Sequence, residues 1–223
     1  MFEYEGVKIS WLGHDGFRIS DDVVIYIDPF NISSVKKADV ILLTHEHFDH
    51  LSLDDIRRIT STDTVIVAPS ICESSLTGVK AKQVITISPG EKVDLPGGVT
   101  VEAIPAYNIN KFRAPGKVFH PKEEGRVGYI LNIKGVKIYH AGDTDFIPEM
   151  KNLKNISVAL LPSGGTYTMD NSEAAEAALA IKPEVAIPMH RWSSSPEAFK
   201  RKVESSSDIK VVVLEPGEEY EIE

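Results

Sequence analysis

The sequence predicts an α/β domain in which two β-sheets are covered on their outer faces by helices. Three observations favour this fold class. Short apolar runs typical of β-strands fill the first half of the 223-residue chain, each half ends in an alternation of strand and helix patterns, and no low-complexity linker divides the chain. We therefore expect a single domain over residues 1–223.

The expected strands show either alternation of apolar and polar residues or a short continuous apolar run. Their ranges are 7–12, 15–19, 23–27, 39–44, 64–68, 83–87, 98–106, 127–133, 135–140, 158–162, 185–189 and 210–214.

Helical patterns are fewer than strand patterns. "LSLDDIRRITS" (51–61) places apolar residues at helical spacing. "DNSEAAEAALAIK" (170–182) opens with Asp170 and Glu173 in the spacing of a capping box, and "SPEAFKRKVES" (195–205) has a proline suited to a first helical position. A weaker helical pattern covers 145–153.

The composition is that of an ordinary folded protein, with 42% apolar and 26% charged residues. The net charge of −9 disfavours a surface built to hold nucleic acid, so we expect no nucleic-acid partner. No apolar run approaches the ~20 residues that cross a bilayer, and "MFEYEGVKI" lacks a secretory pattern. A single cysteine, Cys72, suits a reducing compartment. We expect a cytoplasmic protein without membrane contact.

The stretch "ILLTHEHFDHL" (41–51) runs from an apolar strand directly into His45, His47, Asp49 and His50. In a helix, residues 45 and 47 would point about 200° apart, whereas in an extended segment 45, 47 and 49 share one side. We therefore predict a stretched loop that leaves the strand, with His50 turning into the following helix. The alternative is a polar loop whose histidines gather by coincidence, although such costly side chains rarely cluster.

This histidine loop lies at the carboxyl end of a buried strand, where open α/β sheets tend to place their sites. Imidazole and carboxylate ligands without a thiolate suit Zn²⁺, Mn²⁺ or Fe²⁺ in a catalytic role. The pattern therefore predicts a catalytic metal site.

"THEHFDH" resembles the His-x-His-x-Asp-His motif of the metallo-β-lactamase superfamily of hydrolases. The resemblance implies a four-layer αββα sandwich with metal ions at one edge, between the sheets. "SWLGHDGF", "YHAGDTD" and "GGTYTM" resemble the branch that includes L-ascorbate 6-phosphate lactonase and related metal-dependent hydrolases.

The resemblance also implies a ligand set for one or two divalent metal ions, zinc in the first place and manganese or iron as alternatives. Asp143 is similar to the family's bridging aspartate, His190 to its final histidine, and Asp28 to an aspartate that braces the histidine loop from behind. Seen alone, Asp143 and His190 could equally be surface or capping residues. The implied metal ligands are His45, His47, Asp49, His50, Asp143 and His190.

Asn108 stands where the family usually supplies a histidine to the first metal. His120 could replace that histidine, contact the substrate or simply belong to a loop. His14, in "LGHDG", could line the same edge or have only a turn role, and His140 is expected in the core.

The segment 108–126 carries five cationic residues against two glutamates, in a chain that is acidic as a whole. A cationic loop beside the metals would suit a small anionic substrate, whereas a loop that balances acidic neighbours is the alternative. The candidate substrate contacts are Asn108, Lys111, Arg113 and His120.

We expect metal-assisted hydrolysis of a small, anionic lactone or ester, in which Asp49 orients the attacking water and accepts its proton. The alternatives are a phosphodiesterase or nuclease of the same fold, an iron-dependent oxygenase, or a metal-binding sensor with weak or no turnover. The oligomeric state is left open.

Overall fold

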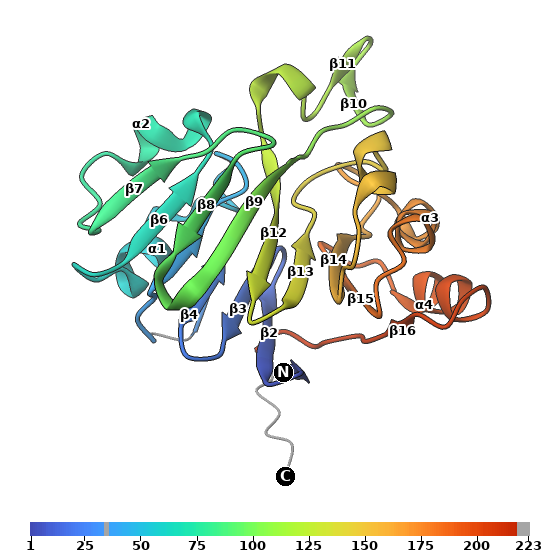
Figure 1. Cartoon of the computed structure of the whole chain (residues 1–223). Helices are drawn as coiled ribbons and strands as arrows, with labels where there is room; N and C mark the ends of the chain where they lie inside the picture. The colour runs from blue at the N-terminus through green and yellow to red at the C-terminus, as the bar shows by residue number, and fades with distance from the viewer. Residues whose placement is uncertain (34–35, 218–223) are drawn as a thin grey trace.

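In the computed structural model, which describes residues 1–33 and 36–217, two seven-stranded sheets pack face to face (Figure 1). Helices α1 and α2 cover the outer face of one sheet, and α3 and α4 cover the outer face of the other. The protein therefore has the four-layer αββα architecture, as predicted.

The first sheet has the order β1-β2-β3-β4-β5-β6-β7, which follows the chain. Strands β1 to β4 pair antiparallel, and β4 to β7 pair parallel. The strands are β1 (Phe2–Tyr4), β2 (Val7–Gly13), β3 (Gly16–Ser20), β4 (Val24–Ile27), β5 (Val40–Leu42), β6 (Val65–Ala68) and β7 (Gln83–Thr86).

The second sheet has the order β16-β15-β14-β13-β12-β9-β8. It repeats the plan of the first sheet, because β8, β9, β12 and β13 pair antiparallel and β13 to β16 pair parallel. A separate hairpin, β10–β11, projects from the connection between β9 and β12 (Figure 1). The strands are β8 (Lys92–Leu95), β9 (Val99–Pro105), β10 (Phe112–Ala114), β11 (Lys117–Val118), β12 (Val127–Ile133), β13 (Val136–His140), β14 (Val158–Pro162), β15 (Val185–Met189) and β16 (Lys210–Val211).

The helices begin where the sequence supplies capping groups. Asp170 caps α3 in a full capping box with Glu173, and Ser52 accepts a hydrogen bond from the Asp55 amide at the start of α1. The α-helices are α1 (Leu53–Ile59), α2 (Glu73–Leu76), α3 (Asn171–Ile181) and α4 (Glu197–Glu204). Short 3₁₀ helices lie at Ser70–Cys72, Pro96–Gly98, Lys122–Glu124 and Pro148–Asn152.

Strands β4, β5 and β6 of the first sheet are buried on both faces. Ile25, Leu42 and Val67 belong to the large apolar core between the sheets. Their neighbours Tyr26 and Ile41 belong to a second core, which also contains apolar residues of α1 and α2. Burial on both faces explains why these strands read as continuous apolar runs in the sequence.

All twelve predicted strands are present, with ends shifted by a few residues. The sequence pattern does not predict β1, β8, β10, β11 or the single turn of α2, because such short, partly exposed segments carry little apolar periodicity. The prediction of a helix over 145–153 needs correction. Only Pro148–Asn152 is helical, as a 3₁₀ helix that begins at its proline.

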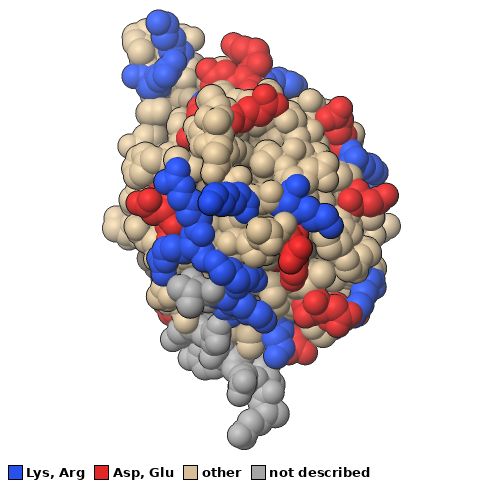
Figure 2. All heavy atoms as spheres, turned by 90° about the vertical axis from the view of Figure 1, so that its left-hand side faces the viewer, with Lys and Arg blue, Asp and Glu red and all other residues tan. Residues whose placement is uncertain are grey.

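The surface mixes charges of both signs. Figure 2 shows Lys and Arg side chains in a band on the face where α1, α2 and β7 lie, with acidic side chains around it. None of these three elements supplies a residue of the site described below. Among residues 1–33 and 36–217, no helix is long and apolar enough to cross a membrane.

The capping box of α3 yields a stability prediction. Asp170→Ala removes the acceptor of the Ser172 and Glu173 amides and is expected to lower the free energy of unfolding by about 1 kcal/mol. Asp170→Asn retains an oxygen acceptor and should lose less. Urea unfolding of both variants measures the difference, and equal stability of the two would contradict the assigned cap.

Candidate metal centre

The histidine loop leaves β5 and then turns. The amides of His50 and Leu51 both donate to the His47 carbonyl, at 3.0 and 2.8 Å. His45 and His47 remain together, with 3.0 Å between Nε2 and Nδ1, whereas Asp49 turns away and lies 3.1 Å from His14 Nε2. The expected stretched loop is therefore wrong beyond His47, because the turn sends Asp49 to a different group of side chains.

Asp28 braces this loop from beneath. It is fully buried at the end of β4 and accepts hydrogen bonds from the Thr44 amide (2.8 Å), the Thr44 hydroxyl (2.5 Å) and His50 Nδ1 (2.8 Å). The Thr44 hydroxyl in turn lies 3.0 Å from His45 Nδ1. These contacts leave Nε2 of both His45 and His50 as the outward-facing nitrogen.

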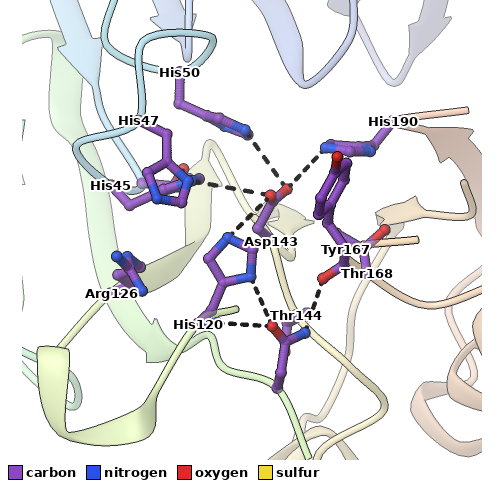
Figure 3. Close-up of polar contacts among 12 residues, drawn as sticks. His45, His47, His50, His120, Arg126, Asp143, Thr144, Tyr167, Thr168 and His190 are labelled. Carbon is purple, nitrogen blue, oxygen red and sulfur yellow. Dashed lines mark hydrogen bonds and ion pairs between the residues drawn. The ribbon is translucent and has the colours of Figure 1, made fainter. Parts of the chain in front are cut away.

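Asp143 lies at the centre of the site, just past β13 (Figure 3). Its Oδ1 is 3.3 Å from His190 Nε2 and 3.6 Å from His50 Nε2. Its Oδ2 is 3.4 Å from His120 Nε2 and 4.0 Å from His45 Nε2. One buried carboxylate thus faces two groups of imidazoles, one on each oxygen.

His120 joins His45 and His47, and ligand-type nitrogens of the three rings lie within 4.8 Å of one another. Asn108 holds this ring in place, because its Oδ1 accepts from both the amide and Nδ1 of His120 at 2.8 Å. The Asn108 amide nitrogen donates to Asp145 (3.0 Å) and to the Tyr167 carbonyl (2.9 Å). The structure therefore places Asn108 behind His120, with its amide fully engaged by the protein.

The two predicted cationic contacts, Lys111 and Arg113, differ in their surroundings. Lys111 donates to Glu173 at 2.6 Å and is 3.8 Å from Asp145, and Arg113 is exposed on β10. Arg126 forms a two-point ion pair with Glu46, the residue between His45 and His47 in the sequence. This ion pair was not predicted, since nothing in the sequence around Glu46 indicates a partner 80 positions away.

The pKa values of the histidines divide into two sets. Burial lowers the pKa of His45 well below its usual value and that of His120 to about 4. Burial acts the same way on His50 and His190, but Asp143 and neighbouring carboxylates outweigh it and raise their pKa values to about 10 and about 9. A metal ion would take the place of these protons.

The residues present fit divalent metal ions. Imidazole nitrogens and carboxylate oxygens are the donors that Zn²⁺, Mn²⁺ and Fe²⁺ accept. His50 Nε2 and Asp143 Oδ1 are buried without a hydrogen-bond partner in the described residues. Buried polar atoms normally have a partner, and a metal ion between them would satisfy both.

A pocket of about 340 Å³ opens beside this centre. His47, Asp49, His120, Asp143 and His190 line its floor, and its walls are aromatic. Two of the wall residues are among the most exposed large apolar side chains of the protein, Phe48 at 76% and Trp192 at 63%. The aromatic wall residues are Phe48, Phe119, Tyr167 and Trp192.

Two groups of imidazoles around a shared aspartate, at one edge of an αββα sandwich, define a metallo-β-lactamase-type metal centre. The chain belongs to this superfamily, because the family model of the β-lactamase superfamily domain matches residues 8–190.

Full-length relatives are named as metal-dependent hydrolases. The UPF0173 metal-dependent hydrolase of Methanopyrus kandleri is 35% identical, over 96% of this chain and 100% of that protein. The UPF0173 metal-dependent hydrolase of Thermococcus kodakarensis is 36% identical, over 97% and 100%. The solved structure of Igni18, a metallo hydrolase of Ignicoccus hospitalis, matches with a TM-score of 0.77 at 32% identity, over 95% of this chain and 96% of that one. The protein is thus a metal-dependent hydrolase of the metallo-β-lactamase superfamily.

The brace formed by Asp28 can be tested without metal. Asp28→Asn, unfolded in urea with a chelator present, is expected to lose about 2 kcal/mol of unfolding free energy, because hydrogen bonds to a charged acceptor are each worth about 1.5–3 kcal/mol. Asp22→Asn is the matched control, since its exposed ion pair with Lys134 should contribute less than about 1 kcal/mol. Equal losses in the two variants would contradict the assigned brace.

Proposed function

We propose that the protein hydrolyses the ester or lactone bond of a small molecule with the help of two divalent metal ions. The observation that carries the proposal is the position of Asp143, whose two carboxylate oxygens face separate groups of imidazoles. One carboxylate between two nitrogen groups is suited to bridge two ions.

His45, His47 and His120 would hold one ion, and Asp49, His50 and His190 the other, with Asp143 between them. Zinc is the first expectation for this donor set, and manganese and iron also accept it. A metal ion bound there would supply Lewis-acid chemistry, which makes water nucleophilic near neutral pH and polarises a carbonyl oxygen. Asn108 acts through His120, whose ring it orients.

Asp49 is the candidate catalytic residue. Its side chain lies at the pocket floor, and 16% of it is exposed. Burial alone would raise its pKa, but His14 and His50 hold the pKa below the usual value, so that the group is an anion at neutral pH. An anionic carboxylate at this place can orient an attacking water molecule and accept its proton.

The walls of the pocket favour a substrate with an apolar portion beside the scissile bond, because four aromatic side chains border it. Fewer residues support an anionic group on the substrate. Of the five cations in 108–126, Lys111, Lys122 and Arg126 pair with glutamates. Arg113 and Lys117, on the β10–β11 hairpin, have no carboxylate partner among the described residues and would be the ones to meet it.

The first test combines metal content with turnover. Protein purified without added metal is expected to contain close to two divalent ions per chain and to hydrolyse aryl esters or lactones, with loss of activity in chelator and recovery on adding metal. Faster turnover of bis(p-nitrophenyl) phosphate would favour a phosphodiesterase. Two bound ions without turnover of either substrate class would favour a sensor and contradict the proposal. The lactonase-like branch stays a prediction from sequence motifs until lactones have been assayed.

The aromatic wall yields a second prediction. Phe48→Ala is expected to lower kcat/KM for phenyl or hexanoyl esters by about tenfold and for acetate esters by less, since apolar contact with the larger group is lost. Val84→Ala is the control, because Val84 is also exposed but lies on the edge strand β7, outside the pocket. An equal loss for large and small esters would show that Phe48 does not contact the substrate.

A further inference from the structure

His14 lies in the turn between β2 and β3 and reaches the metal centre from the first sheet. Its side chain is only 8% exposed, and its Nε2 is 3.1 Å from Asp49 Oδ2. Its ring packs against His190 and His50, with ring centroids 4.1 and 5.0 Å apart. The side chain is thus enclosed by three of the residues proposed to hold the second ion.

The contact with Asp49 has the distance of a hydrogen bond but not its direction. His14 Nε2 is buried without a hydrogen-bond partner, in the same way as His50 Nε2 and Asp143 Oδ1. Ligand-type nitrogens of His14, His50 and His190 lie within 4.8 Å of one another. Several buried polar atoms therefore converge without satisfying one another, as ligands of a common ion do.

The backbone holds His14 in this place. Its carbonyl accepts from the His190 amide (3.1 Å) and from Trp11 Nε1 (2.9 Å). His14 and His190 both have left-handed backbone conformations, with φ of 51° and 46°. Such conformations are costly for residues other than glycine and concentrate at functional sites. The fold thus fixes the two histidines side by side through a direct backbone hydrogen bond.

We infer that His14 is a protein ligand of the second metal ion, an inference that rests on the two-metal centre proposed above. Ligands bonded to one ion at about 2.0–2.2 Å lie about 3–3.6 Å apart, which matches the spacing of His14 from Asp49 and of His190 from Asp143. The second site then offers three imidazoles and two carboxylates, from His14, Asp49, His50, Asp143 and His190. The first offers three imidazoles and Asp143 alone.

This difference makes the two sites chemically unequal. Four protein donors suit the tetrahedral preference of zinc, whereas five favour an ion that accepts a higher coordination number, such as Fe²⁺ or Mn²⁺. The second site should therefore select its metal differently from the first.

The test is His14→Ala, with metal content as the readout. Wild-type protein dialysed against metal-free buffer should keep close to two ions per chain, and the variant close to one, with affinity at the second site lowered by about 100-fold or more. With Co²⁺ in the second site, removing one ligand should shift and intensify the visible absorption bands. Two ions bound with unchanged affinity and an unchanged spectrum would overturn the inference and leave His14 as a neighbour that orients Asp49.

Trp192→Ala is the matched control. Its ring lies 5.0 Å from His14 and 5.7 Å from His190 by centroid, so the variant loosens the same packing but removes no donor nitrogen. Its metal content should equal that of the wild type.

A second measurement keeps the inference testable if His14→Ala fails to fold. In wild-type protein loaded with a spin-active cadmium isotope, the His14 ring nitrogen should show scalar coupling to the metal, and absence of this coupling would overturn the inference. Wild-type protein that binds no metal would instead contradict the two-metal centre itself, so the two failures are distinguishable.

Discussion

The carboxylate of Asp28 connects the backbone of the first sheet to the chemistry of the site. Its own amide donates to the Leu42 carbonyl, which continues the pairing of β4 with β5. Its side chain then accepts from Thr44 and His50, just beyond the end of β5. The end of these strands is thus also the place where His50 is oriented. Asp28 contacts both Thr44 and His50 there.

The two halves of the metal centre come from different sheets, and a line of hydrogen bonds between the sheets keeps them in register. The Tyr129 hydroxyl on β12 donates to the Leu43 carbonyl at 2.6 Å, and His140 Nε2 on β13 lies 2.9 Å from the Asp15 carbonyl. His140 is therefore a satisfied core residue, as the sequence analysis expected. Because these contacts are buried, sliding of one sheet on the other would leave polar groups without partners and would cost free energy.

Much of this arrangement could be predicted from the chain alone. Strand ends followed by His45, Asp143 and His190 were recognisable because residue type and place along the pattern agreed. The path of residues 108–126 could not be predicted in this way. The position of His120 beside Asn108 depends on the contacts of Asn108 with Asp145 and Tyr167, which lie far along the sequence. The departure of Asp49 from its neighbours has a local cause, since the His50 and Leu51 amides both bond to the His47 carbonyl and replace the extended geometry. The local sequence pattern therefore predicts which residues are candidate metal ligands. Which of the two groups around Asp143 each ligand joins depends on the folded backbone and on contacts between distant residues.

The left-handed backbone at Asp28, with φ of 43°, and at the two histidines that share a backbone hydrogen bond has a consequence for redesign. β-branched residues are strained in this conformation, whereas asparagine, aspartate and glycine adopt it more readily. A library meant to change the metal preference of this enzyme should therefore restrict His14, Asp28 and His190 to residues that adopt this conformation. The backbone conformation of these three residues thus limits which side chains can replace them.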